Sequence, residues 1–419
     1  MNEKQFYTEL LGVKDPWHIT MVTLDMQRKR VDIYIEHRPG IQFPCPICQT
    51  FCSVYDHTRE REFRHLQTCQ AATYLHVRVP RIQCPDHGVQ QVVHGLAEEN
   101  SSVTHELERH VLNLEQECSI AGTARLLELD WHTCWDIQER AVARGLARKP
   151  RQMPTRLGVD EKSIASGHKY ETIVCDLDRG TVDHVADDRD QASLESYYRQ
   201  FTEEQRAAVK AVAMDMWEPY IAATKAYLPH AGQKIVFDRF HVMRYVIDAV
   251  DTVRKQEHEC LKRTGCRILT GTKYLWLWNR ENIPRKRRSQ FRDLRNQDLQ
   301  TGRAWSIKEH LRHLWSYRTL GWMRKLFRSW YSWATHSRLA PIIKAARTLK
   351  AHLKNILTYA IHPITNALSE SLNGKIEKVK RLACGFRNRS HYGTAIYFHC
   401  GGLDLYPRRS SLPYQIIPA

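Results

Sequence analysis

The stretch VAMDMWEPY (residues 212–220) sets the interpretation of the middle of the chain. A short apolar run ends there in Asp215, and a tryptophan, an acid and a proline follow it. An unpaired carboxylate at the end of a buried strand is costly, so Asp215 needs a partner. Either it caps a turn or a helix, as aspartate often does, or it binds a metal ion.

The segments on both sides of this stretch alternate between strands and helices. Strands are expected over 156–164, in two runs within 168–189 around a DRG turn, over 211–215 and over 234–242, and helices over 191–208 and 218–231. The order β-β-β-α-β-α-β is that of the ribonuclease H-like fold, in which the first and fourth strands are neighbours. Asp160 lies in the middle of the first strand, so the sequence predicts that Asp160 and Asp215 lie close enough to share a cation.

The chemistry of such a pair indicates which cation it would hold. Two close carboxylates repel each other, and each raises the pKa of the other unless a divalent ion lies between them. Hard oxygen ligands with open positions suit Mg²⁺ or Mn²⁺. Two such ions activate a water or a 3′ hydroxyl while they stabilise the leaving oxygen. We therefore interpret Asp215 as a metal ligand rather than a cap.

A third acid is expected from a later helix, within TNALSESLNGKIEKVKRLACGFRNRSHY (365–392). Glu370, Asn373 and Glu377 fall at positions i, i+3 and i+7, on one helical face. Glu377 has a second interpretation, as the solvated partner of a nearby basic residue. Three basic side chains of this helix are expected to hold a phosphate backbone: Lys378, Lys380 and Arg381.

Two short motifs, CPIC (45–48) and CPDH (84–87), each place two soft ligands three residues apart. This spacing lets one tight turn aim both side chains at a tetrahedral ion, and two such turns complete a shell for one structural Zn²⁺. The four expected ligands are Cys45, Cys48, Cys84 and His87. Coincidence or redox chemistry is the alternative interpretation. Two further thiols of this part, Cys52 and Cys69, are given no role.

The segment SIAGTARLLELDWHTCWDIQERAVARGL (119–146) has helical spacing on both sides of an LELD break. Two short helices joined by a short turn form a helix-turn-helix, whose second helix can enter the major groove of DNA. That helix is expected to begin near Trp131. Five apolar residues are expected to form the core of the pair: Leu126, Leu127, Leu129, Trp135 and Ile137. An ordinary helical hairpin is the alternative.

The net charge of the chain is concentrated in one quarter of its length. Lys and Arg number 63 against 46 Asp and Glu, which gives a net charge of +17. Residues 251–350 hold 24 basic and 7 acidic side chains, so the rest of the chain is balanced. A polyanionic partner fits this region. Its run PRKRRSQFR (284–292) holds four side chains expected to contact phosphates: Arg285, Lys286, Arg287 and Arg288.

Seven of the eleven tryptophans lie in the 131 residues between Asp238 and Glu370. They are Trp276, Trp278, Trp305, Trp315, Trp322, Trp330 and Trp333. An all-helical domain inserted here would bury most of them in its own core. The alternative is that some of them stack on flipped or single-stranded bases near a cut DNA end.

The composition, with 42% hydrophobic and 26% charged residues, is that of a globular protein with a substantial core. There is no long apolar stretch and no basic-then-apolar leader, so neither a membrane span nor a signal peptide is expected. The twelve cysteines are scattered over a long chain. This distribution favours reduced thiols in a cytoplasmic protein.

Three motifs taken together resemble a known family. They are DMW (215–217), DRFH (238–241) and E-x-x-N-x-x-I…KR-x-x-x-G-F-R-N (370–388). They are similar to motifs of the transposases of the ISL-three insertion sequences, a DDE family. The resemblance extends from about residue 40 to residue 400 and includes the order of zinc ribbon, helix-turn-helix and split catalytic core. One departure is Glu377, where that family tends to carry a basic residue.

The resemblance implies roles for particular residues. Asp160, Asp215 and Glu370 match the catalytic triad, which would hold two Mg²⁺ or Mn²⁺ ions per active site. Three further residues match neighbouring motif positions and are candidate supporting residues: Asp238, His241 and Asn373. Of these, Asp238 is also a second candidate for a metal ligand.

The resemblance also implies a function, that of an insertion-sequence transposase in the bacterial cytoplasm, associated with the nucleoid. Such a protein binds the terminal inverted repeats of its element, cleaves DNA by two-metal hydrolysis and joins the 3′ ends to target DNA. Its partner is double-stranded DNA, and the active complex is expected to be at least a homodimer. Two alternatives stay open: a ribonuclease H-like nuclease without strand transfer, and a DNA-binding repressor with an inactive core.

The expected architecture is multidomain α+β. In chain order it comprises an N-terminal strand region (1–40), a zinc ribbon (41–95), a helix-turn-helix domain (100–150), the first part of a ribonuclease H-like core (155–250), a basic helical insertion domain (251–360) and the last part of the core with the catalytic Glu helix (361–405).

Overall fold

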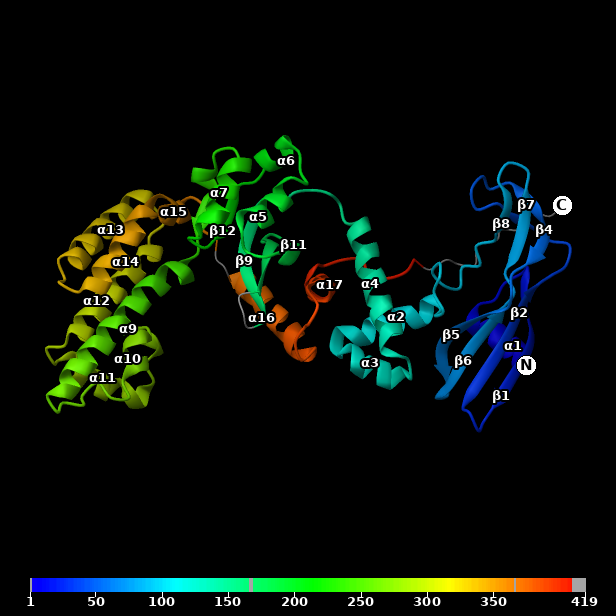
Figure 1. The fold of residues 1–419 in the computed structure, drawn as a ribbon, viewed down its shortest axis with the longest axis horizontal. Coiled ribbons are helices and arrows are strands. Elements are labelled where there is room, and N and C mark those ends of the chain that lie inside the picture. Colours follow the sequence, from blue (N-terminus) through cyan, green and yellow to red (C-terminus); the bar gives the residue numbers. More distant parts are fainter. Residues whose placement is uncertain (1, 166–168, 365–366, 409–419) are drawn as a thin grey trace. The chain divides into compact units, whose positions relative to one another are not determined.

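The computed structural model describes residues 2–165, 169–364 and 367–408, without the side chains of residues 165, 169 and 367–370 (Figure 1). The chain divides into two compact units. One consists of Met1–Lys149 with Leu403–Ala419, and the other of Pro150–Gly402. The boundary falls within the basic, proline-containing stretch ARKPRQMP (147–154). Over the described ranges, no helix has the length and apolar character needed to cross a bilayer.

The first unit begins with two four-stranded sheets that share one core. One sheet has the order β1(Trp17–Asp25), β2(Arg30–His37), β6(Ala71–Val77), β5(Arg61–Thr68), and the other β3(Gln42–Pro44), β4(Phe51–His57), β7(Pro80–Cys84), β8(Gly88–Gln91). Ile33 of the first sheet and Phe43 of the second are fully buried in the same apolar cluster. Strands of the expected zinc-ribbon segment therefore contribute to both sheets, because β5 and β6 pair in the sheet that holds β2.

A helix that the sequence analysis did not expect precedes the first strand. This helix, α1(Glu3–Leu11), begins at Asn2, whose side chain accepts a hydrogen bond from the Gln5 backbone N–H. The Gln5 side chain accepts one from the Asn2 N–H in return, so the two residues form a capping box. The local signal for this helix was thus present in the sequence.

Three helices complete the first unit: α2(His105–Glu117), α3(Ile120–Leu127) and α4(Trp131–Arg148). Each begins after a polar residue whose side chain accepts a backbone hydrogen bond: Thr104, Ser119 and Asp130. Between α3 and α4, Glu128 adopts a left-handed backbone with φ of 53°, which turns the chain. The expected start of the second helix at Trp131 is confirmed.

The core of this helix pair differs from the prediction at one position. Leu127, Trp135 and Ile137 are buried as expected, and Leu129 is partly buried. Leu126, however, is 60% exposed, so its assignment to the core was wrong. Leu126 and Leu127 are consecutive in a helix, and consecutive side chains point in directions about 100° apart, so only one of them faces the core.

The second unit is built on a mixed five-stranded sheet with the order β11(Thr181–Asp187), β10(Lys169–Asp176), β9(Arg156–Ala165), β12(Ala211–Met214), β13(Ile235–Phe237). Strand β9 pairs with β10 antiparallel and with β12 parallel. The predicted adjacency of the Asp160 strand and the strand that precedes Asp215 is therefore confirmed. This pairing brings residues more than fifty positions apart to one place in the sheet.

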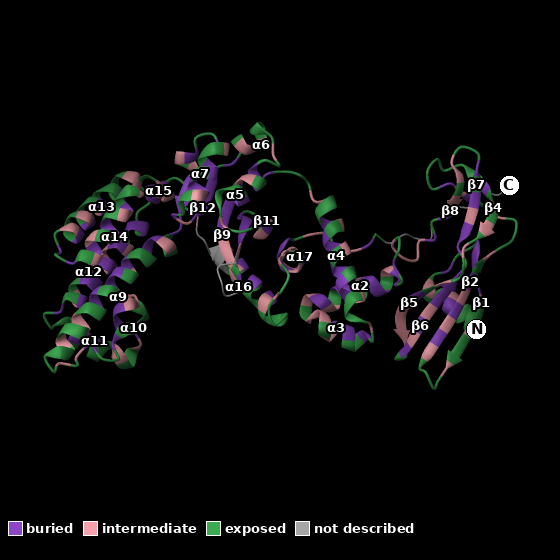
Figure 2. Cartoon of the chain, viewed as in Figure 1, coloured by how far each residue is buried: buried purple, intermediate pink, exposed green. Residues whose placement is uncertain are grey.

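Helices cover both faces of this sheet. Residues of α5(Gln191–Tyr198) and α7(Glu218–Tyr227) share a core with Leu157 and Val212 of the sheet. Residues of α16(Ala367–Leu382) and α17(Arg389–Cys400) pack against Ile164 and Ile173 on the other side. Figure 2 shows the buried residues concentrated in the strands between these layers.

Two sequence-based boundaries in this unit need correction. The helix expected over 191–208 is two helices, because α5 ends at Tyr198 and Thr202 caps a new helix, α6(Glu203–Ala207). The strand expected over 234–242 is confined to β13, after the short helix α8(Ala231–Lys234). Asp238 ends that strand, since its side chain accepts a hydrogen bond from the Phe240 N–H and caps the next helix.

The described elements between β13 and α16 are all helical. They are α9(Arg239–Arg263), α10(Lys273–Leu277), η1(Arg280–Asn282), η2(Arg285–Arg287), α11(Arg288–Arg295), α12(Gln300–Arg312), η3(His313–Ser316), α13(Leu320–Thr335), α14(Ala340–Ala351), α15(Leu353–Leu357) and η4(Thr358–Ala360). Four of the seven tryptophans of this segment are buried: Trp276, Trp305, Trp315 and Trp330. The expectation that most of them lie in a core is confirmed, whereas Trp322 and Trp333 are exposed.

Candidate functional site

The first predicted acid, Asp160, meets a later helix on one face of the sheet. Asp160 of β9 lies directly opposite Ile173 of β10, so their side chains lie on the same face of the sheet, and Ile164 belongs to the same apolar cluster as Ile173. Ile164 packs there with Leu372 and Ile376 of α16. Between these two apolar residues, Asn373 Nδ2 donates a hydrogen bond of 2.5 Å to Asp160 Oδ2. The structure thus brings together Asp160 and the predicted supporting residue Asn373.

The second predicted acid, Asp215, directly follows the neighbouring strand β12. Its Oδ1 atom lies 2.9 Å from His241 Nδ1, and His241 Nε2 lies 3.8 Å from Asp238 Oδ2. Burial lowers the pKa of His241, but the hydrogen bond to Asp215 and the charges of Asp215, Asp238 and Asp160 outweigh it and raise that pKa. The two members of the DRFH motif therefore lie beside the DMW aspartate.

Asp160 and Asp215 also act on a common neighbour that the sequence analysis missed. Burial raises the pKa of Glu161, Arg189 opposes this change, and the charges of Asp215 and Asp160 add to it. Glu161 lines a pocket of about 230 Å³ together with Asp215, Trp217 and His241. The only sequence signal for Glu161 is its position next to Asp160. Alternation along β9 places the Glu161 side chain on the face of the sheet opposite to that of Asp160.

An arginine fixes one wall of this pocket. Arg189 Nη1 lies 3.2 Å from Glu161 Oε1. Its guanidinium carbon lies 4.4 Å from the ring centre of Tyr170 and 4.9 Å from that of Trp217. The Trp217 indole N–H in turn donates to the Arg189 carbonyl oxygen at 3.0 Å. These contacts hold the segment that follows Asp215 in place.

The third predicted acid lies in α16, the helix that contacts Asp160 through Asn373. Glu370 belongs to α16 by its backbone, three positions before Asn373, but its side chain lies outside the described residues. Residues at this spacing are neighbours on a helical surface. The backbone of α16 therefore carries the position of Glu370 on the same side of the helix as the residue that contacts Asp160.

Among the described residues, two groups bring three or more possible metal-ligand atoms within 4.8 Å of one another, and neither contains Asp160 or Asp215. The first comprises Asp32, Glu62 and His76. Arg30 already occupies it, with Nε 2.9 Å from Asp32 Oδ1 and a second contact to Glu62. This group is an ion-pair network whose negative charge is balanced by a guanidinium.

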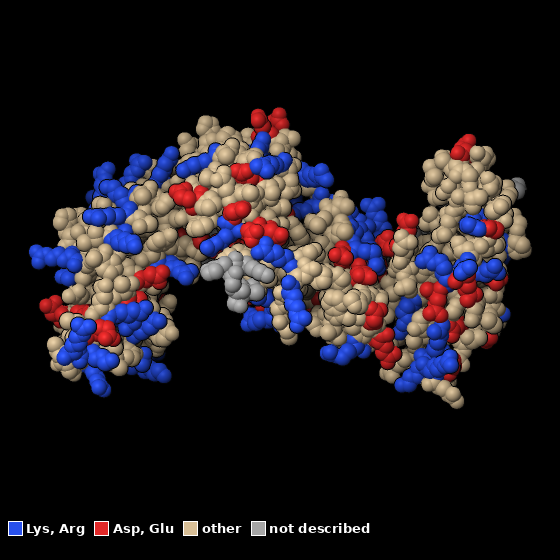
Figure 3. Space-filling model, in the orientation of Figure 1, with Lys and Arg blue, Asp and Glu red and all other residues tan. Residues whose placement is uncertain are grey.

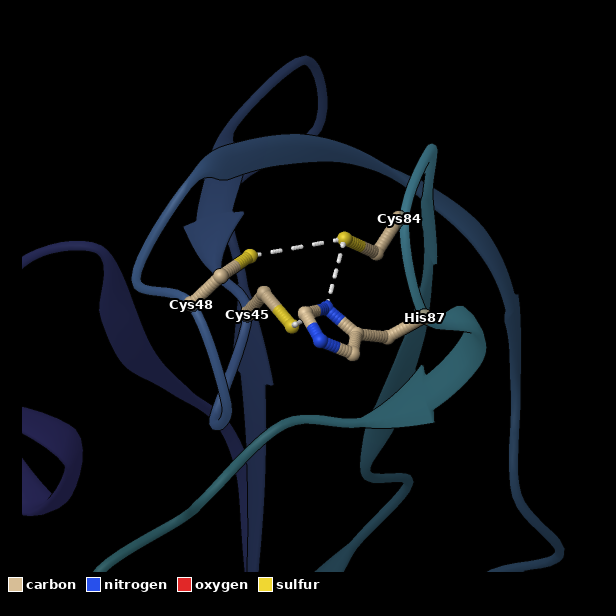
Figure 4. A group of neighbouring side chains, drawn as sticks. All are labelled: Cys45, Cys48, Cys84 and His87. Carbon is tan, nitrogen blue, oxygen red and sulfur yellow. Dashed lines mark hydrogen bonds between the residues drawn. The ribbon is translucent and has the colours of Figure 1, made fainter.

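The second group consists of the four predicted zinc ligands (Figure 4). Cys48 Sγ lies 3.6 Å from Cys84 Sγ, and His87 Nδ1 lies 3.5 Å from Cys84 Sγ and 3.9 Å from Cys45 Sγ. Tetrahedral zinc with its usual bond lengths requires sulfurs about 3.8 Å apart and a nitrogen about 3.5 Å from each sulfur. The donor set and its spacing fit one Zn²⁺.

The two pairs reach this place from two hairpins of one sheet. Cys45 follows β3, whereas Cys84 ends β7 and His87 lies in the turn before β8. Hydrogen bonds with the side chain and backbone of Thr50 lower the pKa of Cys48 to about 6. Burial raises the pKa of Cys84 to about 11. A metal would have to displace the proton of Cys84, because only the thiolate is a good ligand.

Comparison with known proteins places this chain in a family. A family profile described as a transposase matches residues 157–396, more than half of the chain. The chain belongs to the ISL3 family of DDE transposases. A profile for the zinc-finger of the transposases of IS204, IS1001, IS1096 and IS1165 matches residues 42–87, and one for the helix-turn-helix domain of transposase family ISL3 matches residues 93–142. The predicted zinc ribbon and helix-turn-helix are therefore confirmed as domain types.

Two named relatives span nearly the whole transposase. The transposase for insertion sequence element IS1001 from Bordetella parapertussis is 28% identical over 371 residues, which cover 87% of this chain and 90% of the relative. The transposase for insertion sequence element IS1557 from Mycobacterium tuberculosis is 27% identical over 384 residues, which cover 86% of each chain.

The basic residues predicted to contact DNA occupy two helical segments of this transposase. Arg285 and Lys286 are exposed in η2, and Arg287 is partly buried. Arg288 begins α11, and its Nε donates to the Ile283 carbonyl oxygen at 3.2 Å. Figure 3 shows Lys and Arg atoms, with some Asp and Glu atoms among them, at the end of the helical segment where Figure 1 labels α11.

The basic residues of α16 differ in their surroundings. Lys378 and Arg381 are exposed, and so is Glu377. Lys380 Nζ instead donates to the Ser163 carbonyl oxygen at 2.8 Å, which links α16 to β9. Lys380 thus has a structural partner, whereas Lys378 presents its charge to the solvent.

The helix-turn-helix presents the start of its second helix to the solvent. Trp131, the first residue of α4, is 40% exposed and stacks on the buried Trp135 at 5.9 Å. His132 and Asp136 are exposed near the same end. In this motif the N-terminal residues of the second helix contact base edges. The N-terminal end of α4, which is accessible to solvent, is therefore the end that contacts base edges in this motif.

Proposed function

We propose that this transposase binds the terminal inverted repeats of its insertion sequence, cleaves DNA by two-metal phosphodiester hydrolysis and joins the 3′ ends to target DNA. The observation that carries the proposal is the contact between Asn373 and Asp160. It supports a site in which α16 supplies Glu370 on the sheet face that carries Asp160. The adjacency of β9 and β12 supports the arrival of Asp215 at the same edge.

The proposed fold of the second unit is ribonuclease H-like. The sheet order β11-β10-β9-β12-β13 supports this assignment, since it follows the chain order 3-2-1-4-5 with the fourth strand parallel to the first. The helices between β13 and α16 would then form an insertion domain within the core. The boundaries proposed for the six domains stay those of the sequence analysis.

In the proposed reaction, Asp160, Asp215 and Glu370 hold two Mg²⁺ or Mn²⁺ ions. When bound, these ions activate water or a 3′ hydroxyl and stabilise the leaving oxygen. The chain's own part is to hold the carboxylates: Asn373 donates to Asp160, and His241 lies against Asp215. Such outer partners orient a ligand and set its charge. Asp238 orients His241 and caps α9, which favours a supporting role over metal binding.

The zinc ribbon is proposed to hold one structural Zn²⁺ through Cys45, Cys48, Cys84 and His87. With four protein ligands the coordination shell is complete, so this metal would stabilise the fold and take no part in the chemistry. Helix α4 would read the inverted repeat. The exposed Arg285, Lys286, Arg288, Lys378 and Arg381 would contact phosphates, and the partly buried Arg287 and the anchored Lys380 would add to them. Two DNA ends must meet, so the active complex would be at least a homodimer.

The test uses Asp160→Asn in the full-length protein, with Asp178→Asn as the matched control. Asp178 lies in the turn after β10 and pairs with Arg156 on the surface. We expect Asp160→Asn to abolish both cleavage of an inverted-repeat duplex and strand transfer of a precleaved end in Mg²⁺, while Asp178→Asn retains both. Cleavage without strand transfer by the wild-type protein would favour a nuclease. Full processing by Asp160→Asn would refute the catalytic assignment, and DNA binding without any processing by the wild-type protein would favour a repressor.

A further inference from the structure

A second concave site lies in the helical segment, away from the carboxylates. It is a pocket of about 550 Å³ bounded by η1 and α11. Four of its lining residues are arginines: Arg280, Arg288, Arg292 and Arg295. Its lining also includes two buried apolar residues, Phe291 and Ile283, which are 5% and 3% exposed. The lining of the pocket therefore combines buried apolar side chains with four cationic groups.

The local sequence explains why the arginines converge. Arg288, Arg292 and Arg295 fall at positions i, i+4 and i+7 of α11, on one helical face. Phe291, next to this face, packs its ring against Trp276 and Trp305, with ring centres 5.2 and 5.0 Å apart. These tryptophans are buried in the main core of the unit. The arginine face of α11 is thus held by a rigid aromatic anchor.

The positive charge of the pocket is not neutralised by the described part of the protein. In that part, no carboxylate lies within 4.0 Å of the guanidinium nitrogens of the four arginines. Among the described lining residues, the one acid is Glu281, and it is engaged elsewhere, since Arg312 Nη1 donates to its Oε2 at 3.1 Å. Arg30, Arg144 and Arg254, in contrast, each have a carboxylate partner.

Two of the arginines are also positioned before any ligand arrives. Arg288 Nε donates to the Ile283 carbonyl oxygen at 3.2 Å, and the Arg295 guanidinium lies 5.0 Å from the ring centre of Trp305. Holding these long side chains lowers the entropy cost of binding. Guanidinium groups match phosphate oxygens in geometry, because their N–H donors form a planar fork. Converging, preordered and unpaired arginines are the features of a phosphate site.

We infer that this arginine pocket binds the phosphate backbone of DNA, as an anchor separate from the cleavage site and from the helix-turn-helix. The inference rests on the proposed function, in that the DNA it names is the substrate proposed above. The concentration of the net charge of +17 in residues 251–350 supports a polyanion over a small anion. Contacts to phosphates set affinity and register and carry no sequence information. The pocket would therefore add affinity without sequence preference.

The experiment measures duplex binding by full-length protein as a function of salt. The variants are Arg292→Gln, Arg295→Gln and the double variant, titrated by fluorescence anisotropy with an inverted-repeat duplex and with a scrambled one. Each lost phosphate contact lowers the slope of log Kobs against log salt by about 1. We expect the double variant to lose about two units of slope on both duplexes equally. Far-ultraviolet circular dichroism checks that the variants remain folded.

Arg347→Gln is the matched control, because Arg347 is an exposed arginine of α14 outside the pocket. It removes the same charge and should leave the slope unchanged. An unchanged slope in the double variant would overturn the inference, and so would an equal loss in Arg347→Gln. Titration with inorganic pyrophosphate tests a small-anion site. If the double variant loses pyrophosphate binding but keeps the wild-type DNA slope, the DNA assignment is overturned. Cleavage by Asp160→Asn is measured separately, so a failure of the proposed function can be distinguished from a failure of the inference about the arginine pocket.

Discussion

Asn373 Nδ2 lies 2.5 Å from Asp160 Oδ2, a contact between residues 213 positions apart in the chain. It forms only when α16 docks on the sheet, where Leu372 and Ile376 on either side of Asn373 are buried. The burial of these two apolar side chains drives the docking, and the amide follows because it lies on the same helix. Asp160, in the middle of β9, therefore receives its hydrogen bond from a residue near the other end of the unit's sequence.

Replacing Asn373 should weaken the site in a graded manner. Asn373→Ala removes the donor that orients Asp160, and loss of an outer partner typically costs about 10- to 100-fold in metal affinity or activity. Asn373→Asp should cost more at low Mg²⁺, because a second carboxylate would face Asp160 in place of the hydrogen-bond donor, and the two negative charges would repel each other. Single-turnover cleavage over a Mg²⁺ titration measures both effects. Glu377→Gln, an exposed change on the same helix, is the control. Wild-type metal dependence in Asn373→Asp would contradict this role.

Removing one ligand of the cysteine–histidine group should remove the metal. We expect the purified wild-type chain to contain one zinc and Cys84→Ser to contain none, because a closed structural site needs all four ligands. The first unit should then be digested faster by protease, since zinc binding contributes directly to folding. Cys69→Ser, at an exposed thiol outside the group, should keep its zinc. Metal analysis of both proteins by mass spectrometry decides the matter, and one zinc in Cys84→Ser would refute the ligand assignment.

A buried carboxyl should make the helical part of the first unit sensitive to pH. Glu115 of α2 is 1% exposed, neither of its oxygens has a hydrogen-bond partner among the described residues, and burial raises its pKa to about 8. The unfolded chain releases this proton near its ordinary pKa of 4.5, whereas the folded chain keeps it until about pH 8. Stability should therefore fall as the pH rises between these values, by up to about 1.4 kcal/mol per pH unit.

The substitution Glu115→Gln tests this dependence. It should flatten the pH profile and leave α2 more stable than in the wild type at pH 8, because no charge has to be buried. Hydrogen exchange of the α2 amides in the full-length protein, measured at pH 6 and pH 8, reports the local opening free energy. Glu117→Gln, at an exposed position of the same helix, should behave as the wild type does. Equal pH dependence in all three proteins would rule the carboxyl out as the cause.

Two adjacent leucines should differ sharply in their contribution to stability. Leu127 is 7% exposed and Leu126 is 60% exposed. Leu127→Ala should cost about 2–5 kcal/mol of opening free energy in α3 and α4, because it leaves a cavity in the core. Leu126→Ala should stay within about 0.5 kcal/mol of the wild type, as surface changes usually do. Hydrogen exchange of the two helices compares the variants, and similar costs for both would contradict the burial pattern.

The parts of the structure that the sequence predicted are those set by short-range rules. The three-residue spacing predicts the two candidate ligand pairs, Cys45 with Cys48 and Cys84 with His87, and the structure brings all four side chains together. The start of α4 was recognised from the break before Trp131, which Asp130 caps. The helix α1 also had a local signal, the capping box of Asn2 and Gln5, which was overlooked. Hydrophobic alternation and turn residues predicted the strands, and the match of their order to the ribonuclease H-like fold predicted that β9 and β12 are neighbours.

Other features depend on which surfaces meet, and a local pattern does not contain that information. Glu161 belongs to the candidate site because the residues that follow β12, Asp215 to Trp217, line the same pocket. Lys380 was expected to contact DNA, yet it donates to the Ser163 carbonyl oxygen because α16 lies against β9. Leu126 faces the solvent because the packing of α2, α3 and α4 selects one side of α3.

From the sequence alone came the chemistry proposed for this transposase: a thiol and imidazole group expected to bind zinc, carboxylates expected to bind divalent ions and a basic helical segment expected to contact DNA. These depend on residue type and on spacing over a few positions, which covalent geometry fixes. Only the tertiary structure decided which side chains touch, such as Asn373 with Asp160, His241 with Asp215 and the four arginines around one pocket. Contacts over such separations are set by the burial of apolar surface between distant elements, and the polar side chains meet where that packing places them.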